Sequence, residues 1–450
     1  MYRDLTNGNI LKTLLLFSLP MIAGNLLQQF YNIADTLIVG KFLGRDALAA
    51  VGSAYTLMTF LTSILLGLSM GAGALFAIYQ GQGDRERQKA GIVHAFCLIS
   101  LITLLLNTAV YLFIDPLMSF LRVPQEVYAP MREYLWVIFA GLAATFLYNF
   151  FSCLLRALGN SAVPLAFLAV SALLNIALDL LFVLQFSWGV GGAAAATVIA
   201  QYVSGLGILL FTLLRCKGLR PARRHLRRNG TILRDIGRLS VLTCVQQSVM
   251  NFGILMVQGL VNSFGPVVMA AFAAAVKIDS FAYMPVQDFG NAFSTFISQN
   301  YGAGKTERIR QGIRQAVRVS VCFCILISIL VIAFAEKLML LFVQSHETAM
   351  LEAGVHYLRI EGAFYWAIGC LFLFYGLYRA VNRPAMSVVL TAISLGMRVL
   401  LAYVLAVPLG VTGIWLAIPV GWLLADLAGL LFYQRHRTTL LHGGTPPAST

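Results

Sequence analysis

Charged residues are scarce in this chain of 450 residues, since only 11% of them are Asp, Glu, Lys or Arg. A soluble globular protein carries about 25%, because its surface faces water. The shortage therefore excludes an ordinary soluble protein. With 59% hydrophobic residues, 39 glycines and 7 cysteines, the chain is also neither disordered, nor collagen-like, nor a disulfide scaffold.

Motifs of catalysis and metal binding are missing as well. The cysteines are scattered without a CxxC pair or a histidine at metal-ligand spacing, and the histidines lie at predicted helix ends and in loops without an HExxH motif. No GxxxxGK[ST] loop for ATP phosphates and no serine nucleophile motif occurs. The sequence therefore predicts a protein that is not an enzyme and has no resident cofactor. A membrane enzyme is a disfavoured alternative.

Long hydrophobic segments account for most of the chain. About 20 apolar residues cross a bilayer as a helix, and twelve segments of that length occur, six on each side of one long polar stretch. The sequence predicts an all-α integral membrane protein with twelve transmembrane helices in two pseudo-symmetric six-helix bundles. The expected divisions are an N-terminal bundle at 1–214, a basic cytoplasmic linker at 215–235, a C-terminal bundle at 236–435 and a disordered cytoplasmic tail at 436–450.

The positive charges lie mainly on one side of the predicted membrane. With both termini placed on the side of the polar stretch, 24 Lys and Arg residues fall on that side and six on the other. The positive-inside rule therefore predicts cytoplasmic termini in a multi-pass protein of the cytoplasmic membrane. This bias also explains the net charge of +14 without a nucleic-acid partner, and the run RPARRHLRR at 220–228 is interpreted as topological.

An internal repeat relates the two halves. A shift of 221 positions places the loop YQGQGDRERQKAGI at 79–92 on NYGAGKTERIRQGI at 300–313. The same shift pairs Gly44 with Gly265 and Gly189 with Gly410, which favours duplication over chance. Because each half has an even number of helices, both enter from the same side, as in transporters built from parallel repeats.

Polar residues form stripes inside three predicted helices of the first half. Asp35 belongs to a stripe in the first helix, Asn175 and Asp179 lie one turn apart in the fifth, and Thr197 lies in the sixth. Ionisable groups at bilayer depth normally face a cavity or a partner. Two carboxylates and two neutral oxygen donors can bind Na⁺ or share a proton, so these four residues are the predicted cation site.

Further polar and aromatic residues are candidates for a substrate cleft. Neutral side chains of this kind also serve as hydrogen-bonding links between helices, and aromatic rings can hold flat lipophilic cations. The predicted set is Gln28, Phe30, Tyr31, Asn32, Tyr148, Gln201, Gln247, Asn251, Tyr283, Asn291 and Arg398. The repeat does not carry the acidic pair into the second half, and a transport role for Lys277, Asp279, Asp288, Glu361 and Asp426 is left open.

Several motifs resemble the multidrug and toxic compound extrusion (MATE) family. They are SLPMIAGNLLQQFYNIADTLIVGKFLG at 18–44, the loops ending QGQGD and NYGAGK, and RALGN at 156–160. The resemblance covers nearly the whole chain. It implies a V-shaped bacterial transporter, with a cation site formed by an Asp, an Asn-x-x-x-Asp and a Thr, which match Asp35, Asn175, Asp179 and Thr197. Another branch of the family has acids in helices 7 and 10. Here helix 7 offers Gln246 and Gln247, and helix 10 only Glu361 near its outer end.

The resemblance implies a secondary multidrug efflux antiporter, which exchanges H⁺ or Na⁺ for amphiphilic, mostly cationic drugs by alternating access of two bundles. The expected partners are these small molecules and the lipid bilayer, and the expected state is a monomer. Flippases of lipid-linked oligosaccharides have a similar organisation and are the alternative within transport. They usually have fourteen helices, and only Lys277 and Arg398 are predicted at depth to meet an anionic cargo.

Overall fold

The computed structural model describes residues 3–120, 123, 125–227 and 229–441, without the side chains of Arg45, Thr56, Phe120 and residues 251–255. Regular structure in these residues is helical, and they contain no strand. The chain forms two compact units. Unit 1 holds Leu19–Cys244 and the first residues through Asp4, and unit 2 holds Leu5–Ser18 and the chain from Val245 onward.

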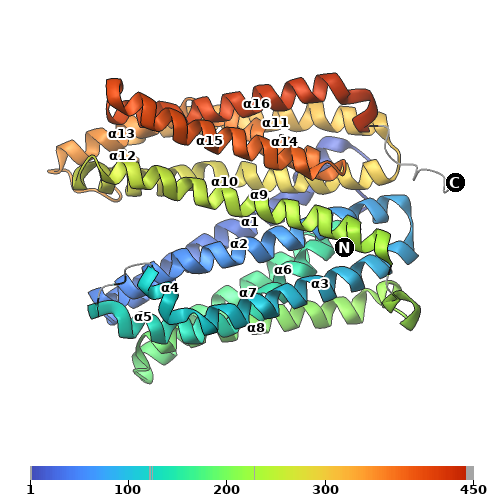
Figure 1. Cartoon of the computed structure of the whole chain (residues 1–450), viewed down its shortest axis with the longest axis horizontal. Helices are drawn as coiled ribbons and strands as arrows, with labels where there is room; N and C mark the ends of the chain where they lie inside the picture. The colour runs from blue at the N-terminus through green and yellow to red at the C-terminus, as the bar shows by residue number, and fades with distance from the viewer. Residues whose placement is uncertain (1–2, 121–122, 124, 228, 442–450) are drawn as a thin grey trace. The chain divides into compact units, whose positions relative to one another are not determined.

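The helices of the first half pack side by side as a bundle (Figure 1). The short helix α4 and the break at η1 interrupt what are otherwise long segments. In chain order the elements are α1 (Ile10–Phe42), α2 (Arg45–Gln82), α3 (Arg85–Leu112), α4 (Ile114–Phe120), α5 (Gln125–Ile138), η1 (Phe139–Gly141), α6 (Leu142–Ala157), α7 (Ala162–Asp179), the π-helix η2 (Leu180–Gln185), α8 (Gly189–Arg215), η3 (Lys217–Leu219) and η4 (Arg223–Leu226).

The second half repeats this pattern. Its elements are α9 (Gly230–Asn262), α10 (Pro266–Gly302), α11 (Thr306–Ala333), α12 (Ala335–Met339), α13 (Thr348–Gly362), α14 (Tyr365–Ala380), α15 (Pro384–Leu409) and α16 (Val411–Leu441). The pair α13 and α14 is bent by 53°. In the described residues ten helices are long and apolar enough to span a bilayer, and this bent pair makes eleven. With α9, which has 33 residues, the twelve predicted spans are confirmed.

The internal repeat is visible in the backbone as well as in the residue types. Gly44 (φ 86°, ψ −173°) precedes α2 and Gly265 (φ 96°, ψ 170°) precedes α10, in a conformation that essentially only glycine adopts. Gly83 and Gly304 follow the same two helices with φ values of 71° and 67°. The predicted duplication therefore holds in three dimensions, because equivalent turns place equivalent helices.

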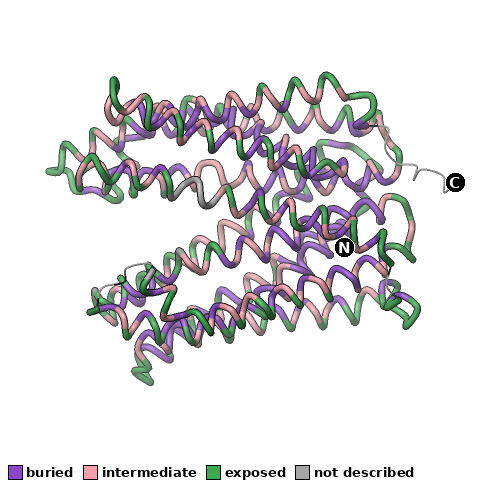
Figure 2. Tube along the Cα trace, viewed as in Figure 1, coloured by how far each residue is buried: buried purple, intermediate pink, exposed green. Residues whose placement is uncertain are grey.

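Each unit is packed closely in its interior and is apolar on its outside. In unit 2, a Cβ added at Gly376 of α14 would lie 2.6 Å from the carbonyl oxygen of Gly290 in α10, so only glycine permits this approach. Small residues at such crossings are typical of helix packing in membranes. Large apolar side chains such as Leu104, Leu173 and Leu427 are more than half exposed, as expected of a lipid-facing surface. Figure 2 shows buried and exposed residues alternating along the helices.

The units differ from the predicted divisions at both ends and at the linker. The first part of α1 belongs to unit 2, and α9 belongs to unit 1 as far as Cys244. The sequence assigned these segments to residues 1–214 and 236–435 instead. The predicted tail also begins too early, since α16 continues through Leu441. The remaining residues of that tail, 442–450, lie outside the described residues.

Candidate cation-binding site

The four predicted cation-site residues come from three helices of unit 1. Asp35 lies in the part of α1 that belongs to this unit, Asn175 and Asp179 lie in α7, and Thr197 lies in α8. Asp179 is fully buried and Asn175 is 2% exposed. The i, i+4 spacing on α7 places these two side chains on one helix face.

A short chain of hydrogen bonds orients the neutral members of the site. The Asn175 amide nitrogen donates to the Thr197 hydroxyl oxygen at 3.2 Å, and that hydroxyl donates to the carbonyl oxygen of Ala193 at 3.2 Å. The Asn175 amide oxygen accepts no hydrogen bond in the described residues. Ser171, one turn earlier on α7, donates to the carbonyl oxygen of Ala200 at 2.8 Å and links the helices α7 and α8.

The two carboxyl groups have unfilled hydrogen-bonding capacity. In the described residues, no hydrogen bond reaches Asp35 Oδ1 or either oxygen of Asp179. The two groups interact with each other directly, so that one can donate to the other once it carries a proton. Two ionised carboxylates in a low-dielectric interior repel each other and lose hydration. The arrangement therefore favours capture of a proton or of a small cation.

The helix that carries Asp179 changes geometry at the site. Asp179 is the last residue of α7, and the π-helix η2 begins at Leu180. Single π turns occur frequently at functional sites because they redirect the side chains around them. Phe182 in this turn packs on Trp188, with ring centroids 4.8 Å apart. No group of three or more His, Cys, Asp or Glu able to hold a metal occurs in the described chain, so Na⁺ binding here would also require the neutral oxygens.

Three tyrosines surround the acid pair, and only one of them was predicted from the sequence. The Tyr31 hydroxyl lies within the electrostatic reach of Asp35 and Asp179, as does that of Tyr134 from α5, and Tyr55 interacts with both tyrosines. Tyr134 is only 7% exposed. The sequence offered one signal for it, since α5 is amphipathic and Tyr134 falls among its buried residues.

The other cleft candidates of unit 1 differ in exposure and in hydrogen bonding. Phe30 is 62% exposed, whereas the Tyr148 hydroxyl donates to the carbonyl oxygen of Pro164 at 3.1 Å. Gln28 and Asn32 are half-buried on α1. The Gln201 amide oxygen has no donor in the described residues. These positions are consistent with a polar lining on one side of the acid pair, and their role stays a prediction.

The candidates of unit 2 lie in varied surroundings. Asn291 accepts a hydrogen bond from Arg379 at 3.0 Å, and Tyr283 packs on Phe372. Gln247 is buried, and the side chain of Asn251 lies outside the described residues. Arg398 is only 8% exposed, so it is an interior residue of unit 2.

A second acidic cluster surrounds Arg398. Asp279 of α10 and Glu361 of α13 both interact electrostatically with Arg398. The Tyr357 hydroxyl donates to Asp279 Oδ2 at 3.4 Å. Glu361 is fully buried at the bend between α13 and α14. The sequence had placed Glu361 near the outer end of its helix. Its burial shows that a position near a helix end does not expose this side chain.

A repeated arrangement of six membrane-spanning helices, with ionisable groups buried at bilayer depth, is the architecture of a membrane transporter. The MatE family model matches residues 20–181 and 241–404. The chain belongs to this family, the MATE transporters.

Individual relatives match over almost the full length. "Probable multidrug resistance protein YpnP" of Bacillus subtilis is 30% identical over 441 residues, covering 96% of this chain and 97% of the relative. "FAD transporter" of Shewanella oneidensis is 26% identical over 445 residues, covering 96% of both chains. A solved structure described as the outward-facing conformation of a multidrug resistance MATE family transporter superposes with a TM-score of 0.91 at 24% identity, covering 97% of this chain and 98% of that one. At that identity the likeness shows the fold.

Proposed function

We propose that this protein is a secondary active efflux antiporter, which exchanges H⁺ or Na⁺ for amphiphilic, mostly cationic drugs. The observation that carries the proposal is the interior pair of the half-buried Asp35 and the buried Asp179. Asp35 Oδ1 and both oxygens of Asp179 accept no hydrogen bond in the described residues, and no lysine or arginine of the described chain neutralises the pair. The name of the Bacillus subtilis relative supports drugs as the cargo. A pair that must acquire positive charge is suited to exchanging one cation for another.

Antiport requires that ion and drug favour different conformations or compete for one site. A ligand shifts an equilibrium only through its differential affinity for two states. Binding of H⁺ or Na⁺ at Asp35 and Asp179 removes negative charge from the site, so a cationic drug held through that charge is released. A bend of α1 near Pro20, which lacks a backbone donor, can transmit the same signal. Binding is reciprocal, so drug lowers ion affinity by the same factor.

The proposed setting is the bacterial cytoplasmic membrane, with both termini in the cytoplasm and a monomer as the working unit. The distribution of 24 against six basic residues supports this orientation, and the relatives named above are bacterial. Two bundles, expected from the sequence at 1–214 and 236–435, would alternate in opening a cleft to either side.

The Shewanella relative suggests a second cargo class. Its name is "FAD transporter", and flavin dinucleotide is anionic, so it would not compete with a cation for the same carboxylates. If this chain carried such a cargo, transport would not follow the competition described above.

The test is flux in proteoliposomes that contain only this protein. Efflux of ethidium and of FAD is followed under a pH gradient and under a Na⁺ gradient imposed separately, with protein-free liposomes as the control. The proposal expects ethidium flux that follows one of the two gradients. Ethidium flux that ignores both would contradict antiport, and gradient-driven FAD flux without ethidium flux would contradict the drug assignment.

A further inference from the structure

The segment that leads into α1 is held by unit 2. The Leu5 backbone nitrogen donates to Gln299 Oε1 at 3.2 Å, and the Asn300 side chain donates to the Leu5 carbonyl oxygen at 3.1 Å. Lys305 donates to the carbonyl oxygen of Thr6 at 2.7 Å. Leu5 itself is fully buried. We call residues Leu5–Gly8 the N-terminal lead-in.

Arg308 completes this attachment at the start of α11. Its guanidinium donates to the carbonyl oxygens of Gly8 at 2.7 Å and Asn7 at 2.8 Å. Hydrogen bonds from a charged donor are stronger than neutral ones. The donors Asn300, Lys305 and Arg308 all come from NYGAGKTER at 300–308, one of the two loops that the internal repeat relates. The loop therefore binds a stretch of backbone from the opposite end of the sequence.

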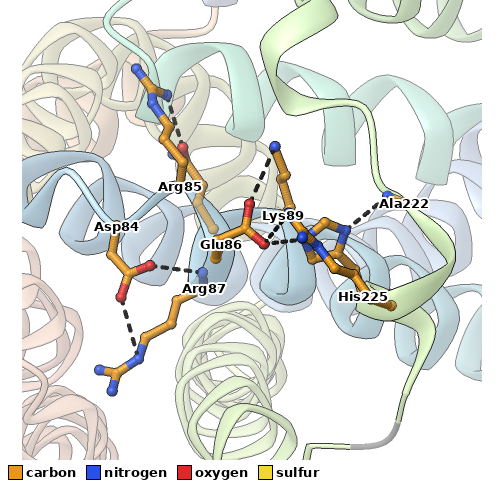
Figure 3. Close-up of polar contacts among 9 residues, drawn as sticks. Asp84, Arg85, Glu86, Arg87, Lys89, Ala222 and His225 are labelled. Atoms are coloured by element: carbon orange, nitrogen blue, oxygen red, sulfur yellow. Dashed lines mark hydrogen bonds and ion pairs between the residues drawn. The ribbon is translucent and has the colours of Figure 1, made fainter.

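The segment that leads into α9 is held by unit 1. Glu86, which is the repeat partner of Glu307, accepts from Arg224 at 2.8 Å and from His225 Nε2 at 2.9 Å (Figure 3). The Ala222 backbone nitrogen donates to His225 Nδ1 at 2.8 Å. His225 is therefore in the tautomer that donates through Nε2 to Glu86. We call residues 222–227 and 229 the linker lead-in.

A second histidine secures the end of the linker lead-in. His94 Nδ1 donates to the carbonyl oxygen of Ala90 at 2.7 Å, which leaves its Nε2 to accept from the Asn229 backbone nitrogen at 3.3 Å. Earlier in the linker, Leu219 is part of the hydrophobic core of unit 1. Glu86 and His94 both lie on α3, so one helix holds both ends of this segment.

The two attachments are exchanged between the halves. Gly8 and Asn229 are repeat partners at the 221-residue offset, yet each is bound by the loop or helix of the other half. The exchange continues into the helices, since α1 passes from unit 2 to unit 1 between Ser18 and Leu19, and α9 passes from unit 1 to unit 2 between Cys244 and Val245. Each unit therefore contains the start of the other half's first helix.

We propose that both lead-ins remain attached to the opposite half throughout the transport cycle, so that α1 and α9 act as straps whose starting ends do not move with the helices that follow. This inference rests on the proposed alternating access. The strap α1 connects an attached start in unit 2 with Asp35 of the cation site in unit 1. Movement of the halves is then absorbed within α1 and α9, and not by release of the lead-ins.

Hydrogen exchange on the unmodified protein tests the attachment. Amide exchange at 3–9 and 222–229 is measured with saturating ethidium, and again under the ion condition that displaces it. The inference expects slow exchange of the Leu5, Ala222 and Asn229 amides in both conditions, since each donates to a side chain. Loss of protection in either condition would overturn it.

Crosslinking tests the consequence for transport. The pairs Asn7→Cys with Lys305→Cys and Glu86→Cys with His225→Cys are joined by a short reducible bis-methanethiosulfonate, with each single variant as the matched control. We expect the crosslinked pairs to transport as fast as, or faster than, the same pairs after reduction. Transport that is lost on crosslinking and returns on reduction would refute the straps. Wild-type protein that transports nothing would instead refute the proposed function.

Discussion

The two halves of the molecule each contain two interacting acids in their interior, and the two pairs differ in whether a basic residue faces them. In unit 1, Asp35 and Asp179 interact with each other, and no lysine or arginine of the described chain neutralises them. In unit 2, Asp279 and Glu361 share Arg398. The negative charge of the first pair can be neutralised only by an ion from outside the protein. The negative charge of the second pair is largely neutralised by Arg398. We therefore interpret unit 1 as the exchanging half and unit 2 as the more static one.

The two halves do not differ in this way at the turns that precede α2 and α10. The conformations of Gly44 and Gly265 agree closely, as do the φ values of Gly83 and Gly304. Duplicated framework and divergent interior are what one expects when only one copy of a buried site exchanges an ion. The comparison can be tested at four places.

The largest expected effect comes from the acid pair of unit 1. Asp35→Asn is expected to reduce gradient-driven efflux to the level of protein-free liposomes, because the exchanging charge is lost while the packing is kept. Asp179→Asn should do the same, and the double variant should be no worse, since two carboxylates that share a site titrate as a unit. Efflux is measured in proteoliposomes, with the exposed Asp115→Asn as the control. Wild-type efflux rates in either single variant would contradict the claim that the acid pair of unit 1 exchanges the ion.

The next effect concerns the cluster of unit 2 and is expected in stability. Arg398→Met leaves Asp279 and Glu361 without a counter-charge, and removing one partner of a buried ion pair costs about 3–5 kcal/mol. Glu361→Gln leaves Asp279 with Arg398, so its loss should be about 1 kcal/mol. The unfolding midpoints of the purified variants are compared in one detergent. Equal losses would show that Arg398 does not neutralise the acids.

A smaller and symmetric effect is expected at the repeated turns. Gly44→Ala and Gly265→Ala each place a Cβ on a backbone with positive φ and extended ψ, which costs about 1–3 kcal/mol. Nothing lies within 4 Å of either added Cβ, so the cost is conformational. Gly52→Ala in α2 also meets nothing within 4 Å, and it should be neutral or slightly stabilising. Thermal unfolding measures all three, and unequal losses at the two turns would contradict the shared framework.

The smallest effect is expected at an exposed ion pair of the first half. Arg132, which donates to Asp115 at 2.8 Å, and the Tyr128 hydroxyl hold the pKa of the Asp115 carboxyl below its ordinary value. A lowered pKa stabilises the fold above the unfolded value of about 3.9, and this contribution is lost as pH falls through the folded value. The Tm of wild type should exceed that of Asp115→Asn slightly at pH 7 and converge with it on acidification. A Tm difference that grows on acidification would show that the ionised Asp115 carboxylate does not stabilise the fold.

The sequence predicted the framework because the framework depends on local signals. Hydrophobic length defines a span, glycine marks a turn, and spacings of three and four residues place Asn175 and Asp179 on one face. The paired loops revealed the duplication at an offset that the backbone conformations repeat. Each of these signals is readable within a few neighbouring residues.

Features that depend on distant helices were not predictable in the same way. The cluster of Asp279, Glu361 and Arg398 joins three helices that no periodicity links. The bend of 53° between α13 and α14 was not predicted either. Tyr134 joins the acids of unit 1 from a helix that the polar stripes did not include. The exchange of the lead-ins was invisible because it requires hydrogen bonds between residues as far apart as Leu5 and Asn300.

The attachment of the N-terminal lead-in also sets an order on biogenesis. Leu5 is bonded to Arg308, 303 positions further along the chain. Ribosomes add about 5–20 residues per second, so the first residues wait about 15–60 seconds before their partners exist. During that interval the start of α1 is inserted without its final neighbours. The first half therefore cannot complete its fold by itself, and an insertase or chaperone that shields this nascent segment would influence the yield of functional protein.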